Sequence, residues 1–307
     1  FGPTAAGKTG ASISLAKALG GEIINADSRQ VYRSMPIITA MPTLKEQAQV
    51  PHHLFAFLDP AEPFSVGTWL GAAREQAEKI WQRGHIPIFV GGTGFYLKVL
   101  QEGMSPMPAT DRDILGDYQA RRHKEGNQAL FAELEQIDPL LAASTDAANS
   151  HRVLRGLTLY KQTGKTLTAW QQEPQQGALK ADFAKLAISP LRDVLNDRIQ
   201  RRYHMMIEEG VLEEALYLYH QYLQNKSPDA LLPPACKSIG LHDYAAYFDG
   251  TITQAQAHAR VQQQMRRYAK RQRTWLRNSY QPDKIYPSSS YEQEMIEFVR
   301  HFFGKKV

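Results

Sequence analysis

Apolar and polar positions over the first 110 residues alternate between two periods and predict a repeated unit of helix and strand. Residues 7–19 are helix-permissive and end at paired glycines, after which the short segment 22–25 predicts a strand. Apolar side chains then recur at helical spacing between Ser65 and Gly84, and a buried type of strand follows at 86–90. Repetition of this unit favours a parallel sheet covered by helices, which is an α/β fold.

The middle of the chain has no strand-like segments. Helix-forming stretches take over from about 110 to 170, at 113–124, 128–137 and 151–162. A glutamine-rich connection at 171–177 closes this part of the chain. We therefore predict an all-helical insertion at 110–177, within a core built from 1–109 and 178–307.

The α/β pattern resumes after the insertion. Residues 183–188 predict a strand, and Ser189-Pro190 predicts a helix cap followed by proline at the first helical position. Further helical segments are expected at 191–209, 254–277 and, as a short tail element, 291–303. Earlier in the chain, His52-His53 is expected to precede a strand that ends at Asp59-Pro60.

Composition limits the class of protein. A chain of 307 residues that is 43% hydrophobic and 22% charged is typical of a soluble globular protein with room for two domains. Cys236 is the only cysteine, which excludes a disulfide framework and a thiolate metal cluster and favours a cytoplasmic protein. Phe1 starts no signal peptide, and no apolar segment approaches the roughly 20 residues of a membrane span. We expect no membrane association.

The net charge of +5 is concentrated in one region. Between Thr251 and Pro282 there is no acidic residue, and two aromatic residues, Tyr268 and Trp275, lie among seven basic ones. This basic run comprises Arg260, Arg266, Arg267, Lys270, Arg271, Arg273 and Arg277. A solvated helix face with two core aromatics is the alternative, but such faces usually alternate their charges. The pattern favours a surface that binds a polyanion such as nucleic acid.

The start of the chain carries a phosphate-binding motif. The residues Gly2, Pro3, Thr4, Ala5, Ala6, Gly7, Lys8 and Thr9 satisfy G-x-x-x-x-G-K-[ST] at every required position. The glycines let backbone N–H groups converge on phosphate oxygens at a helix N-terminus, where the helix dipole also favours anions. Lys8 adds a positive charge, and the Thr9 hydroxyl is the expected ligand of Mg²⁺. This segment, the P-loop, is predicted to bind a phosphate or diphosphate.

Two other segments are predicted to end at the same edge of the sheet. Asp27 follows the strand 22–25, where a carboxylate can coordinate Mg²⁺ or act as a base. Gly91-Gly92-Thr93-Gly94 follows the strand 86–90 and permits close backbone approach, with the Thr93 hydroxyl available to a ligand.

Two less specific features are the pair Arg198 and Arg202 and the dipeptide His52-His53. Arg198 and Arg202 are four residues apart, so they share a helix face that either reaches phosphates or lies on the surface. His52-His53 lacks the spacing of a metal site and is interpreted as structural.

Together, the P-loop, the segments at the edge of the sheet and the basic run indicate a Mg²⁺-assisted phosphate site joined to a nucleic-acid-binding surface. They leave open a P-loop kinase, an RNA enzyme driven by nucleotide hydrolysis and a transferase with a diphosphate leaving group.

Five segments in order carry a family resemblance: 2–9, Asn-Ala-Asp-Ser-Arg-Gln-Val-Tyr (25–32), Pro-His-His-Leu (51–54), Val-Gly-Gly-Thr-Gly-Phe-Tyr (90–96) and Ala-Lys-Arg-Gln-Arg-Thr-Trp-Leu-Arg (269–277). Together they resemble the bacterial tRNA dimethylallyltransferases, over nearly the whole chain. The resemblance implies transfer of a dimethylallyl group from its diphosphate to the exocyclic amine of the adenosine 3′-adjacent to a tRNA anticodon, with Mg²⁺. In that family the P-loop holds the diphosphate leaving group.

The resemblance also implies roles for individual residues. Asp27 matches the general base, Thr4 and Thr93 match active-site hydroxyls, and Arg202 matches a diphosphate-binding arginine. The insertion is expected to grip the anticodon stem-loop, and the protein to act as a monomer. The implied tRNA-binding residues are Asp27, Ser28, Arg29, Gln30, Thr93, His151, Arg152, Arg155, Lys237, Gly240, His242, Lys270 and Arg271.

The chain departs from the family pattern at a few positions. Ile38 and Met41 replace a glycine and a lysine, and Leu241-His242 stand where tyrosine and a basic residue are usual. These changes concern affinity and tRNA contacts more than the reaction. A prenyltransferase of free adenine nucleotides and a P-loop kinase are the alternative functions, although the former has little use for the insertion or the basic run.

Overall fold

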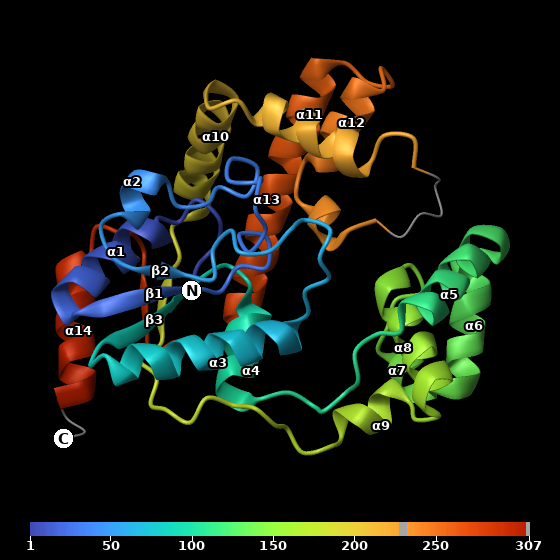
Figure 1. Ribbon diagram of the computed structural model, residues 1–307, viewed down its shortest axis with the longest axis horizontal. Helices are drawn as coiled ribbons and strands as arrows, with labels where there is room; N and C mark the ends of the chain where they lie inside the picture. Colours follow the sequence, from blue (N-terminus) through green and yellow to red (C-terminus); the bar gives the residue numbers. More distant parts are fainter. Residues whose placement is uncertain (227–231, 305–307) are drawn as a thin grey trace. The chain divides into compact units, whose positions relative to one another are not determined.

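The computed structural model describes residues 1–226 and 232–304 and divides them into two compact units (Figure 1). The first unit comprises Phe1–Gln101 and Leu179–Asn225 together with the described residues from 232 onward. The second is built from Glu102–Ala178 and also includes Lys226. No described helix combines the length and the apolar character that a membrane span requires.

A parallel sheet forms the centre of the first unit. Strand β1 (Gly21–Asn25) lies between β2 (His52–His53) and β3 (Ile86–Val90), and α1 (Lys8–Leu19) and α3 (Val66–Gln82) pack against it. The α/β class and the helix-and-strand repeat predicted for the first 110 residues are confirmed, with boundaries shifted by one residue or less at β1 and β3.

Side chains alternate along β1, so that one face of the sheet packs against α1 and the other carries a charged cluster. Ile23 packs against Ile13 and Ala16 of α1, whereas its neighbour Glu22 points to the opposite face and meets Arg83, which follows α3. Because paired residues of parallel strands share a face, His52 opposite Ile23 lies on the α1 side. His53 lies on the Glu22 side.

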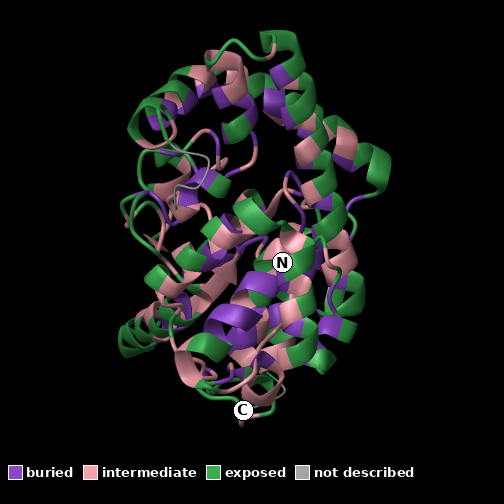
Figure 2. Ribbon diagram, turned by 90° about the vertical axis from the view of Figure 1, so that its right-hand side faces the viewer, coloured by how far each residue is buried: buried purple, intermediate pink, exposed green. Residues whose placement is uncertain are grey.

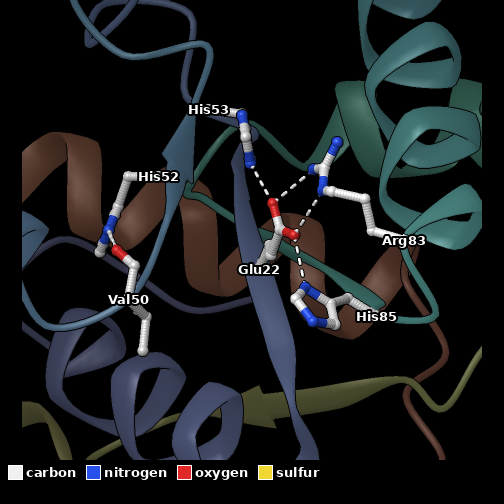
Figure 3. Close-up of polar contacts among 6 residues, drawn as sticks. All are labelled: Glu22, Val50, His52, His53, Arg83 and His85. Atoms are coloured by element: carbon white, nitrogen blue, oxygen red, sulfur yellow. Dashed lines mark hydrogen bonds and ion pairs between the residues drawn. The ribbon is translucent and has the colours of Figure 1, made fainter.

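Glu22 is nearly inaccessible, with 3% of its side chain exposed, and accepts hydrogen bonds from three residues (Figure 3). Arg83 donates from Nε at 3.0 Å and Nη2 at 2.6 Å, and His53 Nε2 and His85 Nδ1 each lie 2.6 Å from a carboxylate oxygen. Chiefly the Arg83 hydrogen bonds, with those of the two histidines, lower the pKa of Glu22 to about 2. The cluster ties the three strands together, away from the carboxyl edge that carries Asp27.

The prediction of a strand that follows His52-His53 and ends at Asp59-Pro60 is wrong. The histidines themselves form β2, and Leu54 and Ala56, with φ of 62° and 44°, turn the chain out of extended conformation immediately afterwards. Pairing returns only as a single bridge between Tyr32 and Leu58.

A second parallel pair supports the P-loop. Strand β4 (Leu186–Ile188) pairs with β5 (Lys284–Tyr286), and Phe1 lies beside β4 because its nitrogen donates to the Leu186 carbonyl at 2.8 Å. Only the last three residues of the predicted strand 183–188 are in this ladder.

The helix after β4 begins later than predicted. Helix α10 (Arg192–Glu208) follows Leu191, which has an extended ψ of 151° and provides no side-chain cap. The predicted cap at Ser189-Pro190 is therefore wrong, because Ser189 donates its backbone N–H to the Tyr286 carbonyl and continues the ladder.

Helices complete the first unit, and Figure 2 shows many of them buried on one face and exposed on the other. Helices α10 and α12 (Leu241–Phe248) pack against α13 (Gln254–Asn278), and α11 (Val211–Tyr222) packs against α10 and α12. Their shared core includes Ile199, Tyr203, Tyr244 and Val261. The predicted helix 254–277 is confirmed as α13. The remaining helices of this unit are α2 (Leu44–Gln47), α4 (Gly94–Glu102), the 3₁₀ turn η1 (Pro234–Lys237) and α14 (Glu292–Gly304).

The helices of the second unit lie between residues 112 and 171 and are joined by short turns. Leu130, Leu134, Val153 and Leu157 form its core, and Asp138 accepts hydrogen bonds from the Thr168 backbone and hydroxyl at 2.9 and 2.6 Å. Its helices are α5 (Arg112–Glu125), α6 (Asn127–Ile137), α7 (Pro139–Ala143), α8 (Ser150–Thr163) and α9 (Leu167–Gln171). The three helices predicted from the sequence correspond to α5, α6 and α8.

Candidate active site

The P-loop curls between β4 and the first turn of α1. Gly7 precedes the helix with φ of 94°, a conformation that glycine adopts without strain, and Ala5 also has a positive φ of 62°. A Cβ at Gly2 would lie 2.6 Å from the Ile188 carbonyl oxygen, so the loop passes too close to β4 for a side chain there. Lys8 folds back over the loop, and its Nζ donates to the Pro3 carbonyl at 2.9 Å.

The loop borders a cavity of about 270 Å³ within the first unit. Thr4 through Thr9 line one side of this cavity, which we call the site cavity. The other predicted residues that line it are Asp27, Ser28, Arg29, Gln30, Arg202, Lys237 and Arg271. Segments that are far apart in the sequence therefore meet at the carboxyl ends of the strands, where open parallel sheets bind ligands.

Asp27 follows the end of β1 and is fixed by its neighbours. The Asn25 side chain accepts a hydrogen bond from the Asp27 backbone at 2.8 Å, and the Arg29 backbone donates to Asp27 Oδ1 at 2.9 Å. Asn25 is itself fully buried and donates to the Leu54 carbonyl. One carboxylate oxygen is thus held by the backbone, in a turn that a buried amide stabilises.

Thr93 lies behind Asp27 and connects two site segments. Its backbone donates to the Ala26 carbonyl at 3.2 Å, and its hydroxyl oxygen accepts from the Ser28 backbone at 3.0 Å. Thr93 also shares a hydrogen bond with Tyr268, whose phenol pKa is raised, mainly by burial and then by the Asp27 charge. The tyrosine is therefore a neutral hydroxyl beside the carboxylate.

Gln272 joins the P-loop to the segment after β3, and its role was missed from the sequence. Only 4% of the residue is exposed. Its Oε1 accepts from the Thr4 backbone at 2.8 Å, and its Nε2 donates to the Gly92 carbonyl at 2.9 Å. A neutral glutamine inside a basic run gives no chemical signal, although its spacing of four from Tyr268 places both on one helix face.

The glycines after β3 are required by close packing. A Cβ at Gly91 would lie 2.0 Å from the Ala26 carbonyl oxygen, and one at Gly94 would lie 2.1 Å from the Trp275 ring. A Cβ at Gly92 would meet Gln272 Nε2 at 2.1 Å. The weak sequence signal of these glycines is thus explained by the approach of β1 and α13.

Three positive side chains give the P-loop side of the cavity its charge. Burial lowers the pKa of Lys8 to about 8, Asp27 opposes this shift, and Arg202 adds to it. Burial also lowers the pKa of Arg202. Arg198 Nη1 donates to the Ala6 carbonyl at 3.1 Å, so Arg198 and Arg202 both face the loop, whereas Arg201 is exposed. Partly desolvated cations at a helix N-terminus bind anions more strongly than exposed ones.

The remaining wall of the site cavity is apolar. The apolar side chains that line it include Ile23, Ile38, Phe55, Val90, Met206, Val261 and Met265. His52 lies among them, with Nδ1 2.8 Å from the Val50 carbonyl and with no hydrogen-bond partner for Nε2 among the residues that the structure describes. Of the two histidines interpreted as structural, His53 belongs to the Glu22 cluster and His52 faces the cavity. No group of three or more potential metal-ligating side chains occurs in the described part of the chain.

The loop that carries the departures Ile38 and Met41 is held from two sides. Gln30 Nε2 donates to the Thr39 and Ala40 carbonyls, and Glu214 of α11 accepts from the Ile37 and Ile38 backbones at 3.0 and 2.7 Å. Ile38 lines the site cavity, so its side chain occupies space that a glycine would leave open.

The other predicted tRNA-binding residues do not line the site cavity. Gly240 is buried at the start of α12 with φ of 91°, while His242 and Lys270 are exposed in the first unit. His151, Arg152 and Arg155 lie on α8 of the second unit, where Arg155 donates to the Thr110 hydroxyl at 2.6 Å. Contact of these residues with tRNA stays a prediction.

Comparison with known proteins places the chain in one family. A model of the family described as IPP transferase matches residues 30–279. The tRNA dimethylallyltransferase of Parvibaculum lavamentivorans is 40% identical over 301 residues, covering 97% of this chain and 94% of the relative. That of Magnetococcus marinus is 38% identical over 319 residues and covers 100% of both chains.

Solved structures agree with the sequence comparison. The full-length tRNA isopentenylpyrophosphate transferase from Bacillus halodurans superposes with a TM-score of 0.68 at 35% identity, covering 99% of this chain and 94% of that one. A eukaryotic dimethylallyltransferase acting on tRNA gives a TM-score of 0.74 at 32% identity, covering 90% and 68%. With a family match over most of its length and relatives aligned across nearly all of it, the chain belongs to the IPP transferase family.

Proposed function

We propose that the protein transfers a dimethylallyl group from dimethylallyl diphosphate to the exocyclic amine of the adenosine 3′-adjacent to the anticodon in tRNA. The observation that carries this proposal is the site cavity itself. One space brings together an anion-binding loop, a fixed carboxylate and an apolar wall. Each of these serves one part of the reaction: the leaving diphosphate, the amine proton and the hydrocarbon chain.

The P-loop side binds the diphosphate. Its backbone amides, Lys8 and Arg202 are the groups that stabilise negative charge as the allylic C–O bond breaks. Such stabilisation matters because an adenine amine is a poor nucleophile, so the bond to diphosphate must break largely before the new C–N bond forms. The electron pair of the broken bond stays on the diphosphate, which leaves with the positive side chains around it.

The oxygen donors of the site fit a Mg²⁺ ion. Thr9 and Asp27 both line the cavity, and magnesium usually takes one or two protein oxygens together with phosphate oxygens and water. Thr9 Oγ1 would hold the ion, which would supply further charge neutralisation to the diphosphate. With few protein ligands, the remaining coordination would come from the substrate and water.

Asp27 is the base in this proposal. The amine nitrogen forms the new bond to the allylic carbon and then gives up a proton, which the Asp27 carboxylate accepts. Because Arg29 N–H holds one carboxylate oxygen, the other is available to the amine. Thr93 and Tyr268 position the segment around it through the hydrogen bonds described above.

The apolar wall holds the five-carbon chain and excludes water. Exclusion is needed because an allylic cation exposed to water would be hydrolysed. The adenosine must reach this wall from outside, and its amine is not accessible while the base is stacked in the anticodon loop. The base therefore has to leave the stack to enter the cavity.

The test is direct. The protein is incubated with dimethylallyl diphosphate, Mg²⁺ and bulk tRNA, and the nucleosides are then analysed by mass. We expect adenosine heavier by one dimethylallyl group and release of diphosphate. Consumption of ATP without diphosphate release would favour a P-loop kinase, and modification of free adenine nucleotides in preference to tRNA would favour the other alternative.

A further inference from the structure

A groove runs along α13 and continues the site cavity. The residues that line it are Arg267, Lys270, Arg271, Thr274, Trp275, Asn278 and Ser279. They are spaced three and four apart, so they form one stripe of the helix surface. Arg271 lines both the groove and the site cavity. A chain bound along this stripe therefore reaches Arg271, which also borders the cavity that contains Asp27.

An exposed aromatic ring stands beside this groove. Phe95 is 47% exposed and lies on the first turn of α4, two residues after Thr93. Its ring and that of Trp275 are in a T-shaped arrangement, with centroids 6.3 Å apart and planes at 85°. Trp275 in turn packs directly on Gly94, where no Cβ fits. Phe95 is thus held in place by a supported indole while much of its surface faces solvent.

Exposed aromatics are common on protein surfaces, so exposure alone carries little weight. Two observations in the surroundings of Phe95 add weight. The groove beside it contains three cationic side chains and no acidic one among its lining residues. Arg271 stacks on Tyr268 with its guanidinium carbon 5.5 Å from the ring centroid, next to the site cavity. Cations that follow a backbone, together with aromatic faces for bases, are the two components of single-stranded nucleic-acid sites.

We propose that Phe95 stacks on the nucleotide next to the target adenosine, while the cations of the groove contact the RNA phosphates. This inference rests on the proposed function. When the target base leaves the anticodon stack, its neighbour loses a stacking partner, and an aromatic ring beside the groove can replace that contact. Phe95 would therefore stabilise the flipped-out state and act as a positioning residue rather than a catalytic one.

The test compares the protein variants Phe95→Ala, Phe95→Tyr and Tyr217→Ala. Each is mixed with an RNA stem-loop that carries the fluorescent base 2-aminopurine at the target position. Tyr217 is a matched control because it is 50% exposed on α11 and lines neither the cavity nor the groove. RNA affinity, the rise in 2-aminopurine fluorescence on binding and the affinity for dimethylallyl diphosphate are measured for each variant.

We expect Phe95→Ala to bind RNA roughly tenfold more weakly, the size of one lost base–aromatic stack, with a smaller fluorescence rise. Phe95→Tyr and Tyr217→Ala should match the wild type, and diphosphate affinity should be unchanged in all three. Equal RNA affinity and fluorescence for Phe95→Ala and wild type would overturn the inference, as would a loss in Phe95→Tyr as large as in Phe95→Ala. Wild-type protein that fails to prenylate tRNA would instead count against the proposed function.

Discussion

Replacing Gln272 by methionine tests whether one neutral side chain organises the active site. Methionine has nearly the volume of glutamine, so the substitution removes two hydrogen bonds while leaving little empty space. The amide links the Thr4 backbone of the P-loop to the Gly92 carbonyl after β3. Without it, both backbone groups lose their partner on α13.

The expected loss of stability follows from those two contacts. A buried donor or acceptor left unsatisfied costs about 1–3 kcal/mol, which gives about 2–6 kcal/mol for the pair. The Thr4 end is only half-buried, so water can reach part of it and the lower half of that range, about 2–4 kcal/mol, is expected. The P-loop also loses one of its anchors, so dimethylallyl diphosphate should bind more weakly.

Urea unfolding and diphosphate titration measure the two effects. Gln263→Met is the control, because it makes the same substitution at an exposed position of α13 and should change stability by no more than about 0.5 kcal/mol. If Gln272→Met unfolds at the wild-type urea concentration and binds the allylic diphosphate equally well, the hydrogen bonds through α13 do not organise the site.

Three further predictions concern charge and proton transfer. Because the pKa of Lys8 is lowered to about 8, the free enzyme loses this positive charge as pH rises above 8, and diphosphate affinity should fall by up to tenfold per pH unit toward that of Lys8→Ala. The affinity of the Lys8→Ala variant should show no such fall. If affinity depends on pH in the same way in both proteins, Lys8 is not the group responsible. Asp27→Asn should fold and bind both substrates but turn over roughly 10²- to 10⁴-fold more slowly; near-normal turnover would remove the base role. If the basic run contacts phosphates, neutralising four of its residues should weaken tRNA binding and flatten its salt dependence by roughly 0.7 to 0.9 per lost contact, whereas unchanged binding would make the run a solvated surface. Those four residues are Arg266, Arg267, Lys270 and Arg273.

The sequence predicted the elements whose signals are local. Such signals are glycines, helical spacing and short apolar segments, which are visible within a few residues. They predicted the P-loop, the first two long helices and the strands 22–25 and 86–90. The positions that failed depend on tertiary pairing. Ser189 has the side chain of a helix cap, but its backbone N–H is used by β5, and the two-residue β2 is too short to show a pattern of its own.

The same distinction applies within the site. Asp27 and Lys8 could be predicted because a charged residue in or near a phosphate-binding motif indicates its function directly in the sequence. Gln272 and His52 were not assigned a place in the site, because a neutral side chain acquires its role only from what the fold brings within hydrogen-bond distance. The glycines at 91, 92 and 94 were visible, but the reason for them, the approach of Ala26 and α13, could not be read from spacing.

Helix α13 shows why one element can serve both substrates of this reaction. Tyr268 and Gln272, one turn apart, form a stripe that faces Thr93 and the P-loop, while Arg267, Arg271 and Trp275 form the adjacent stripe along the groove. The 3.6-residue period of the helix keeps the stripes beside each other, and Arg271 borders both. The residues that fix the diphosphate loop and those that face the groove therefore share one rigid backbone. A shift of α13 on binding RNA would necessarily reach Thr4 and Gly92 through Gln272.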